Sequence, residues 1–198
     1  TRDNLKNSYA QVIADLIEAD RYLDPDDNAY NAIYAKNAAV HALWARVALY
    51  MQDWDAAIEH SSDVIDSGIF KLADCNSNYS STQTLLQYLW NGDASFEIIF
   101  KLGYTSTSYG SPQGAVFLNF TRDYYYYYPD FVPSQAALDL YQSGDQRYGA
   151  YFRTLQTGYS HQLSCPLLVK YYGNTGLIDL KIYHRNMPKI LRLAEQYL

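Results

Sequence analysis

Glycine is absent from the first third of the chain, and this absence constrains the fold more than any other feature. All ten glycines lie at or after Gly68. Residues 1–70 carry 12 acidic and five basic residues, whereas residues 71–198 carry nine acidic and ten basic residues. Glycine destabilises helix interiors and is favoured in turns. The sequence therefore predicts an acidic, helical first third, followed by a remainder that mixes loops with short elements.

Three helices are predicted before Gly68, at about residues 3–23, 34–51 and 54–66. The first carries apolar residues on one helical face, namely Leu5, Tyr9, Val12, Leu16, Ala19 and Leu23. The second has alanines on the face that a neighbouring helix would approach. The third is expected to turn inward the residues Trp54, Ala57, Ile58, Ser61, Val64 and Ile65. Asp53 is a suitable N-cap for this third helix, and Gly68 a suitable residue just after its end.

The second and third helices form a helix–turn–helix unit over residues 35–68. Its length of about 34 residues is the period of the tetratricopeptide repeat. The sequence contains one good copy, whereas a solenoid needs about three repeats to be stable. An ordinary antiparallel helix pair is the alternative interpretation.

The chain after Gly68 reads as a mixture of short elements and loops. A strand is predicted at Phe96–Lys101 from its apolar and branched residues. A long segment rich in Gly, Ser, Thr, Tyr and Pro follows at residues 102–133. A helix is predicted at about 133–143, then loops and short strands at 144–183. Apolar residues at helical spacing predict an amphipathic helix at 187–198.

Charge and cysteine content exclude several classes of protein. The net charge of −6 and the pI of about 5.0 argue against binding to nucleic acid, which needs a basic surface. No apolar stretch reaches the ~18 residues of a membrane span. Two cysteines, Cys75 and Cys165, are too few for a disulfide scaffold. Whether they pair is left open, with two unpaired thiols the somewhat favoured alternative.

Signatures of catalysis, cofactors and metals are missing. The sequence has no phosphate-binding loop, dinucleotide fingerprint, serine-hydrolase elbow or CxxC pair. His41 and His60 are expected on helices without a metal-binding partner three or four residues further on. Asp93, Glu97 and Asp123 have no spacing that supports a glycosidase pair. We therefore predict no catalytic residue, no cofactor and no metal.

Tyrosine is the remaining positive signal, with 22 residues. The segment 102–133 contains the uninterrupted run Tyr124–Tyr128, which cannot be all core because neighbouring residues of a strand point to opposite faces. Exposed aromatic rings commonly mark binding surfaces. The candidate ligand-binding residues are Tyr104, Tyr109, Phe117, Tyr124, Tyr126 and Tyr128. Ligand contact, a protein interface and loop packing all remain open for this cluster.

Five separated segments share a further pattern. They are YAQVIADLIEADRYL (9–23), AKNAAVHALWARVALYMQDWDAAIEHSSDVIDSGIFKL (35–72), SFEIIFKL (95–102), FVPSQAALDLYQSGDQRYGAYF (131–152) and MPKILRLAEQYL (187–198). In this order and spacing they resemble the SusD/RagB family of nutrient-binding outer-membrane lipoproteins. Residues 186–189 and the tyrosine segment depart from the family pattern, and no binding motif of the family maps residue by residue onto this chain.

The resemblance implies a mainly α fold, with tetratricopeptide-like helix pairs, long loops and a few short strands. Residues 1–198 would form a single SusD-like domain fragment of a longer protein, with residues 1–70 as its helical repeat part. The implied function is non-catalytic binding of a glycan or oligosaccharide nutrient, as in starch and polysaccharide utilisation. The ligand would be delivered to a TonB-dependent, SusC-like transporter at the outer-membrane surface.

The resemblance places the lipid anchor outside this chain, and it does not identify the glycan. The alternative function is a helical-repeat module that binds proteins and has no small-molecule ligand of its own. Its discriminating observation would be transporter binding that does not depend on the tyrosine run.

Overall fold

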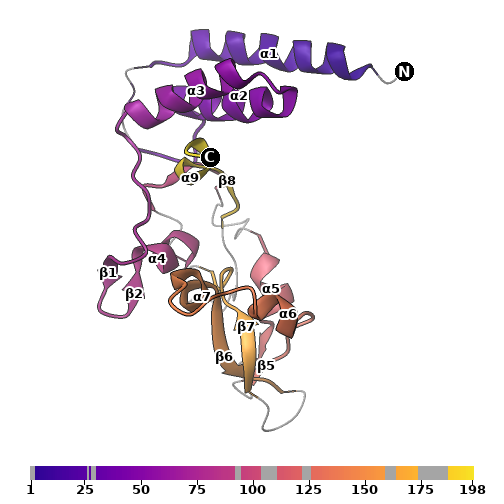
Figure 1. Ribbon diagram of the computed structural model, residues 1–198, viewed down its shortest axis with the longest axis vertical. Coiled ribbons are helices and arrows are strands. Elements are labelled where there is room, and N and C mark those ends of the chain that lie inside the picture. Colours follow the sequence, from indigo (N-terminus) through magenta and orange to yellow (C-terminus); the bar gives the residue numbers. More distant parts are fainter. Residues whose placement is uncertain are drawn as a thin grey trace. The chain divides into compact units, whose positions relative to one another are not determined.

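The computed structural model describes residues 3–25, 27, 30–91, 95–103, 111–121, 126–158, 164–173 and 187–198 (Figure 1). The chain divides into two compact units. Unit 1 comprises Thr1–Leu72, Phe96–Leu102 and Lys189–Leu198, and unit 2 comprises Ala73–Ser95 and Gly103–Pro188. Helices dominate the described part of the chain, in agreement with the predicted mainly α class.

Unit 1 begins with the three predicted helices: α1 at Leu5–Tyr22, α2 at Asn37–Met51 and α3 at Trp54–Asp66. Asp53 caps α3 as predicted, because its carboxylate accepts a hydrogen bond from the Ala56 amide at 3.2 Å. Gly68 follows α3 with a φ of +66°, a left-handed conformation that glycine adopts without strain. The local capping signals therefore set the ends of α3.

The inward face of α3 is narrower than predicted. Val64 is buried, but Trp54 is 57% exposed and Ile58 is 66% exposed. The prediction was wrong for these two side chains because they line an open groove beside residues 195–198 instead of packing into the core. Along α1 the stripe is likewise incomplete, since Leu16 is buried and Leu5 is 71% exposed.

A two-stranded antiparallel sheet completes unit 1. Strand β3, at Ile98–Lys101, confirms most of the predicted strand and pairs with β8, at Lys189–Arg192. The core of the unit contains Ala39, Ala42, Val64, Ile99, Leu191 and Leu193. The small side chains on α2 therefore lie in the core, as their spacing indicated.

The predicted helix at 187–198 is largely wrong. Its first half is strand β8, and only Leu193–Gln196 forms a helix, α9. Pairing with β3 decides the outcome: the Leu193 amide donates to the Glu97 carbonyl at 2.9 Å, and Leu191 is buried in the core. Helical spacing within one segment carries no information about this distant partner.

Unit 2 is built from short elements. They are β1 (Asn78–Ser80), β2 (Gln83–Thr84), α4 (Leu85–Asn91), α5 (Gln113–Phe117), β4 (Phe120–Thr121), β5 (Tyr126–Tyr127), α6 (Gln135–Leu138), α7 (Gln146–Tyr151), β6 (Phe152–Gln156) and β7 (Ser164–Leu168). Antiparallel pairs form between β1 and β2, β4 and β5, and β6 and β7. A small core contains Leu118, Leu167 and Val169.

Two predictions within unit 2 need correction. The helix predicted at about 133–143 is the four-residue α6, capped by Ser134, and the chain then turns through Gly144 at a φ of +88°. Residues 144–183 were expected to lack helices, but Asp145 caps α7 by accepting a hydrogen bond from the Arg147 amide at 2.9 Å. A helix of six residues is too short to produce a recognisable periodic pattern.

The structure also bears on the two cysteines and on membrane-spanning helices. Cys75 and Cys165 are both free thiols, which is the favoured one of the two alternatives. Within the ranges that the structure describes, no helix is both long enough and apolar enough to cross a membrane.

Candidate functional site

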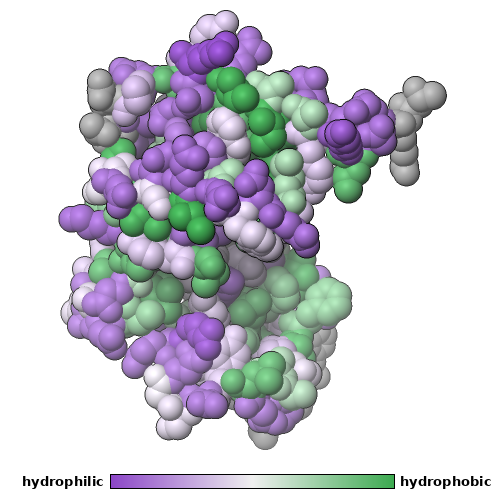
Figure 2. Space-filling model, turned by 45° about the horizontal axis from the view of Figure 1, so that its top comes forward, coloured by the Kyte–Doolittle hydropathy of each residue, from purple (hydrophilic) through white to green (hydrophobic). Residues whose placement is uncertain are grey.

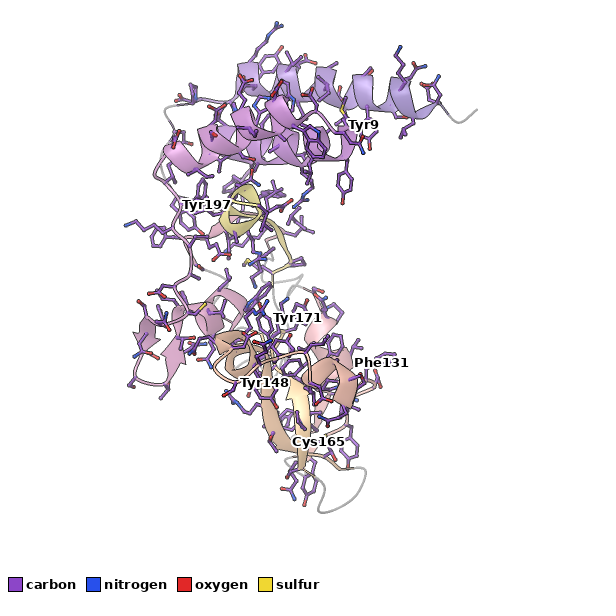
Figure 3. The ribbon with its side chains drawn as sticks, in the orientation of Figure 1. Tyr9, Phe131, Tyr148, Cys165, Tyr171 and Tyr197 are labelled. Carbon is purple, nitrogen blue, oxygen red and sulfur yellow. The ribbon has the colours of Figure 1, made fainter. Side chains whose placement is uncertain are left out.

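The aromatic residues of unit 2 form the candidate ligand site (Figure 3). Of the six residues predicted from sequence, Phe117, Tyr126 and Tyr128 are described, and each is partly buried. Tyr104, Tyr109 and Tyr124 lie outside the described residues. Phe117 ends α5, and Tyr126 begins β5. The chain just after β5 lies beside α5, since the Asp130 amide donates to the Val116 carbonyl of α5 at 2.9 Å.

The described tyrosines of the run, Tyr126–Tyr128, have different surroundings. Tyr127 lies against the core of unit 2 and 5.0 Å from the Phe120 ring. Burial raises the pKa of Tyr127 above its ordinary value, and a hydrogen bond with Tyr172 raises it further. Tyr126 precedes it on β5 and points to the opposite face. The Tyr128 ring covers Gly158 so closely that a Cβ atom there would overlap it.

Phe117 borders a second group of aromatic rings. Its ring stacks on Tyr171 with a centroid distance of 6.0 Å and an interplanar angle of 28°. The Lys170 ammonium lies 4.0 Å from the Trp90 ring, 4.8 Å from Tyr151 and 5.6 Å from Tyr171. A cation over aromatic faces is attracted by their negative charge density. Lys170 therefore lies over three rings, one of which, Tyr171, stacks on Phe117.

Two further aromatic groups were missed by the sequence analysis. Tyr79 of β1 stacks on Tyr88 of α4 at 3.5 Å and 7°, and Tyr79 is 52% exposed. The other of these two groups contains Tyr141, Tyr148 and Phe152, with ring centroids 5.4–5.9 Å apart. These residues are separated by turns that sequence spacing does not reveal. Both groups add exposed ring faces to unit 2.

Arg147 belongs to the second of these groups, 5.8 Å from the centre of the Tyr141 ring. Its guanidinium also pairs with Asp145 at 2.6 Å. This hydrogen bond is the main reason that the pKa of Asp145 lies below its ordinary value. The arrangement fixes a charged donor next to exposed rings, which is a polar handle that a hydroxyl-rich ligand can use.

Glu97 is a buried carboxylate that forms an ion pair. Among the described residues it is the one buried carboxylate. It directly precedes β3 and forms an ion pair of 2.9 Å with Arg192 of β8. It lies in unit 1, whereas the aromatic groups belong to unit 2. Asp93 and Asp123 lie outside the described residues. The Glu97 carboxylate therefore takes part in an ion pair of unit 1 and is not part of the aromatic groups of unit 2.

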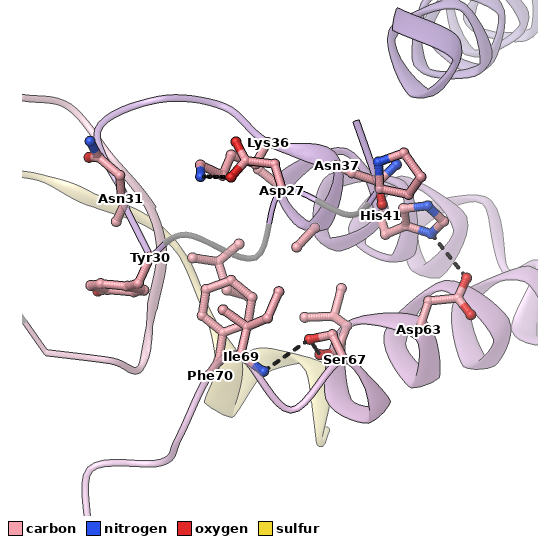
Figure 4. Close-up of a pocket in the computed structure, with 16 residues that line it drawn as sticks. Asp27, Tyr30, Asn31, Lys36, Asn37, His41, Asp63, Ser67, Ile69 and Phe70 are labelled. Carbon is pink, nitrogen blue, oxygen red and sulfur yellow. Dashed lines mark hydrogen bonds and ion pairs between the residues drawn. The ribbon is translucent and has the colours of Figure 1, made fainter. Parts of the chain in front are cut away.

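Unit 1 contains a small cavity of about 70 Å³ beside α2 and α3 (Figure 4). Its lining includes Tyr30, Asn37, His41, Asp63 and Phe70. Small-molecule sites usually measure ~300–1,000 Å³, so this cavity is too small for a sugar. Figure 4 shows His41 and Asp63 facing each other at one end of it.

The surroundings of His41, which lines this cavity, differ from those predicted. His41 and His60, expected to lack metal-binding partners, approach each other with their Nδ1 atoms 3.1 Å apart. Asp63, three residues after His60, lies within 3.0 Å of His41 Nδ1. The pairing of His60 with Asp63 three residues later is present in the sequence and contradicts that expectation, whereas the approach of His41 depends on the fold, which brings α2 beside α3. Burial, and then the neighbouring His41, lower the pKa of His60.

An apolar groove runs along α2 and α3 on another face of unit 1. It has a volume of about 490 Å³, and its lining includes Leu49, Trp54, Ile58, Tyr197 and Leu198. Leu49 is 51% exposed. On the face of the molecule that Figure 2 shows, apolar residues lie in patches among polar residues. An apolar groove on a helical scaffold is a surface that can accept another polypeptide segment.

No family model matches the chain, and no curated protein matches it. Solved structures do. A SusD superfamily protein from Bacteroides thetaiotaomicron VPI-5482 matches 99% of this chain with a TM-score of 0.71 and 24% identity. Surface glycan-binding protein A from Bacteroides fluxus matches 96% of it at a TM-score of 0.65 and 23% identity.

A third structure, surface glycan-binding protein A from Bacteroides uniformis, matches 99% of the chain at a TM-score of 0.68 and 15% identity. The chain spans 42%, 45% and 44% of the thetaiotaomicron, fluxus and uniformis structures, respectively. At these identities the comparison establishes the fold. The resemblance to the SusD superfamily that the five sequence segments indicated is therefore confirmed at the level of fold.

Proposed function

We propose, on the premise that this chain has the fold of SusD-superfamily proteins, that it belongs to a non-catalytic protein that binds glycans. The observation that carries the proposal is the fold match over 96–99% of the chain to structures that include two surface glycan-binding proteins. In this proposal the two units are parts of one SusD-like domain. The helices α2 and α3 form a tetratricopeptide-like pair that serves as scaffold.

The ligand surface is proposed to lie on the aromatic side chains of unit 2. Apolar C–H faces of a sugar ring stack on aromatic rings, while tyrosine hydroxyls hydrogen-bond the sugar hydroxyls. Tyrosine suits this task because its large ring loses little conformational entropy on binding. The proposed residues are Tyr104, Tyr109, Phe117, Tyr124, Tyr126 and Tyr128. Tyr171, stacked on Phe117, extends the group.

Affinity electrophoresis of the full-length protein tests glycan binding. Gels that contain plant, host or microbial polysaccharides should retard the protein in at least one case. Replacing Tyr126 by Ala should weaken the retardation, since one ring contact contributes about 0.5–1.5 kcal/mol, or roughly 2–12-fold in affinity. Tyr22→Ala is the matched control, because Tyr22 is 80% exposed on α1 of unit 1. Equal mobility in every gel would contradict the proposal.

The proposal extends to nutrient uptake at the cell surface. The protein would sit at the outer-membrane surface through a lipid anchor outside this chain and deliver its glycan to a TonB-dependent, SusC-like transporter. Surface labelling of intact cells and co-purification of the transporter test these two steps. They are separate from glycan binding, so either can fail without the other.

A second candidate function is a helical-repeat module that binds proteins without a glycan ligand. The groove along α2 and α3, with Trp54 and Ile58 exposed, favours it. The discriminating observation is partner co-purification with a Tyr126→Ala, Tyr128→Ala protein. Retained partner binding together with an absence of glycan binding by the unchanged protein would favour the second candidate.

A further inference from the structure

We propose that His41, His60 and Asp63 form a binding site for a divalent transition-metal ion, with Zn²⁺ as its best fit. The three residues lie on α2 and α3 of unit 1, and each has one ligand atom within 4.8 Å of those of the other two. Imidazole nitrogen and carboxylate oxygen are ligands that Zn²⁺ takes in proteins. The site is distinct from the aromatic surface of unit 2.

The spacing of the three ligand atoms fits a tetrahedral ion. His41 Nδ1 lies 3.1 Å from His60 Nδ1 and 3.0 Å from Asp63 Oδ2, and His60 Nδ1 lies 3.8 Å from Asp63 Oδ2. Zn²⁺ binds such atoms at ~2.0–2.2 Å, so two ligands on one tetrahedral face are roughly 3.3–3.5 Å apart. The three observed separations lie on both sides of this value. Small side-chain adjustments would make the triangle regular.

Asp20 supplies the outer partner that metal-binding histidines usually have. Its Oδ1 atom lies 3.2 Å from His41 Nε2, and Asn37 holds the same oxygen through a hydrogen bond of 2.5 Å. A proton on Nε2 donated to Asp20 leaves the lone pair of Nδ1 directed at His60 and Asp63. Carboxylate–histidine–metal contacts of this kind fix the tautomer and raise the basicity of the ligand.

A metal ion satisfies this cluster better than a proton does. With Nε2 of His41 bonded to Asp20, the atoms that face each other are two imidazole nitrogens and one carboxylate oxygen. One proton on His41 Nδ1 can be shared with His60 and Asp63, but it cannot serve all three atoms at good geometry. A cation at their centre removes the repulsion between the lone pairs of all three.

The rings of the site are held in place before any ion binds. His60 stacks on Trp44 with centroids 4.1 Å apart and an angle of 29°. The side chains of His41 and His60 are 17% and 12% exposed, whereas that of Asp63 is 51% exposed. The ion would therefore have partly buried nitrogen ligands and an open side for water. Because Asp20 belongs to α1, a bound ion would link all three long helices of unit 1.

Calorimetric titration of the full-length protein with Zn²⁺ alone, after treatment with a chelator, tests the site. We expect one bound ion per chain. His60→Gln and Asp63→Asn should each weaken binding more than 100-fold, beyond the roughly 10–100-fold that loss of an outer partner costs. Asp20→Asn should weaken it within that smaller range. Asp66→Asn is the matched control, since Asp66 is an exposed aspartate of the same helix, and it should bind normally.

Two further readings separate the site from adventitious binding. Co²⁺ should give the visible absorption of a tetrahedral site, and its binding should quench Trp44, which stacks on His60. Circular dichroism checks that each variant is folded; Asp63→Asn keeps an exposed side chain and is expected to fold. Absence of Zn²⁺ binding, or equal binding by the Asp63→Asn and Asp66→Asn proteins, would overturn the proposal. Glycan binding by unit 2 is unaffected by either result.

Discussion

Consecutive tyrosines in this chain have different tasks. Tyr127 packs on the core around Leu118 and Leu167, while Tyr128 lies over Gly158. The period-2 alternation of a strand separates Tyr126 from Tyr127. The sequence could predict that the run divides, because this follows from strand geometry. It could not predict which member packs on the core, since that depends on the pairing of β4 with β5.

Gly158 is expected to control the position of the Tyr128 ring. A Cβ atom at residue 158 would overlap that ring, so Gly158→Ala should displace it and cost about 1–3 kcal/mol of unfolding free energy. Urea denaturation measures the loss, and binding of a retained polysaccharide measures the effect on the site. Unchanged stability and unchanged binding would show that the ring is free to move aside.

Asp74 provides a titration that depends on one hydroxyl. The hydrogen bond from Ser77 at 2.5 Å, and then that from the Asn76 amide, lower the pKa of the Asp74 carboxyl. The charged form is favoured in the folded state, so this contribution to stability is present above the ordinary pKa of ~3.9 and is lost as the pH falls through the lowered value. Ser77→Ala should raise the midpoint in an NMR titration; an unchanged midpoint would contradict the assignment.

The elements that sequence analysis predicted best are those with local signals. Asp53 and Gly68 mark the ends of α3, and both behave as predicted. The elements it missed depend on distant partners: β8 is a strand because β3 lies beside it. The cluster of His41 and His60 was missed for the same reason, since its two histidines occupy different helices. Sequence spacing reveals contacts along one helix, and only the fold reveals contacts between helices.

Removal of the Asp53 cap should weaken α3. Asp53→Ala removes the acceptor of the Ala56 amide and should cost about 0.5–2 kcal/mol in unfolding free energy. Thermal and urea denaturation measure it. Asp53→Ser keeps a capping oxygen and should retain most of the stability, so equal losses in the two variants would mean that the cap is not the cause.

At the scale of the whole molecule, the described residues include two hydrophobic clusters that share no residue. One lies among α2, α3, β3 and β8 and the other around Leu118, Leu167 and Val169. The fold match to SusD-superfamily structures covers residues of both. We therefore propose that unit 1 provides the scaffold and the metal site and that unit 2 contacts the glycan.

A cavity created in one core should lower the stability of its own unit first. Leu167 is completely buried, so Leu167→Ala should destabilise unit 2 by about 2–5 kcal/mol. Hydrogen exchange should then lose protection in β6 and β7 while the amides of α2 and α3 keep theirs. Equal loss of protection in both units would show that the two cores unfold together.

Glycan binding by aromatic side chains of unit 2 is tested most directly by calorimetric titration. The full-length protein is titrated with the polysaccharide that retards it most, or with its oligosaccharides. We expect saturable binding whose affinity falls at least about fourfold in a Tyr126→Ala, Tyr128→Ala protein and stays unchanged in Tyr22→Ala. Equal affinity in the unchanged protein and in the double variant would contradict it.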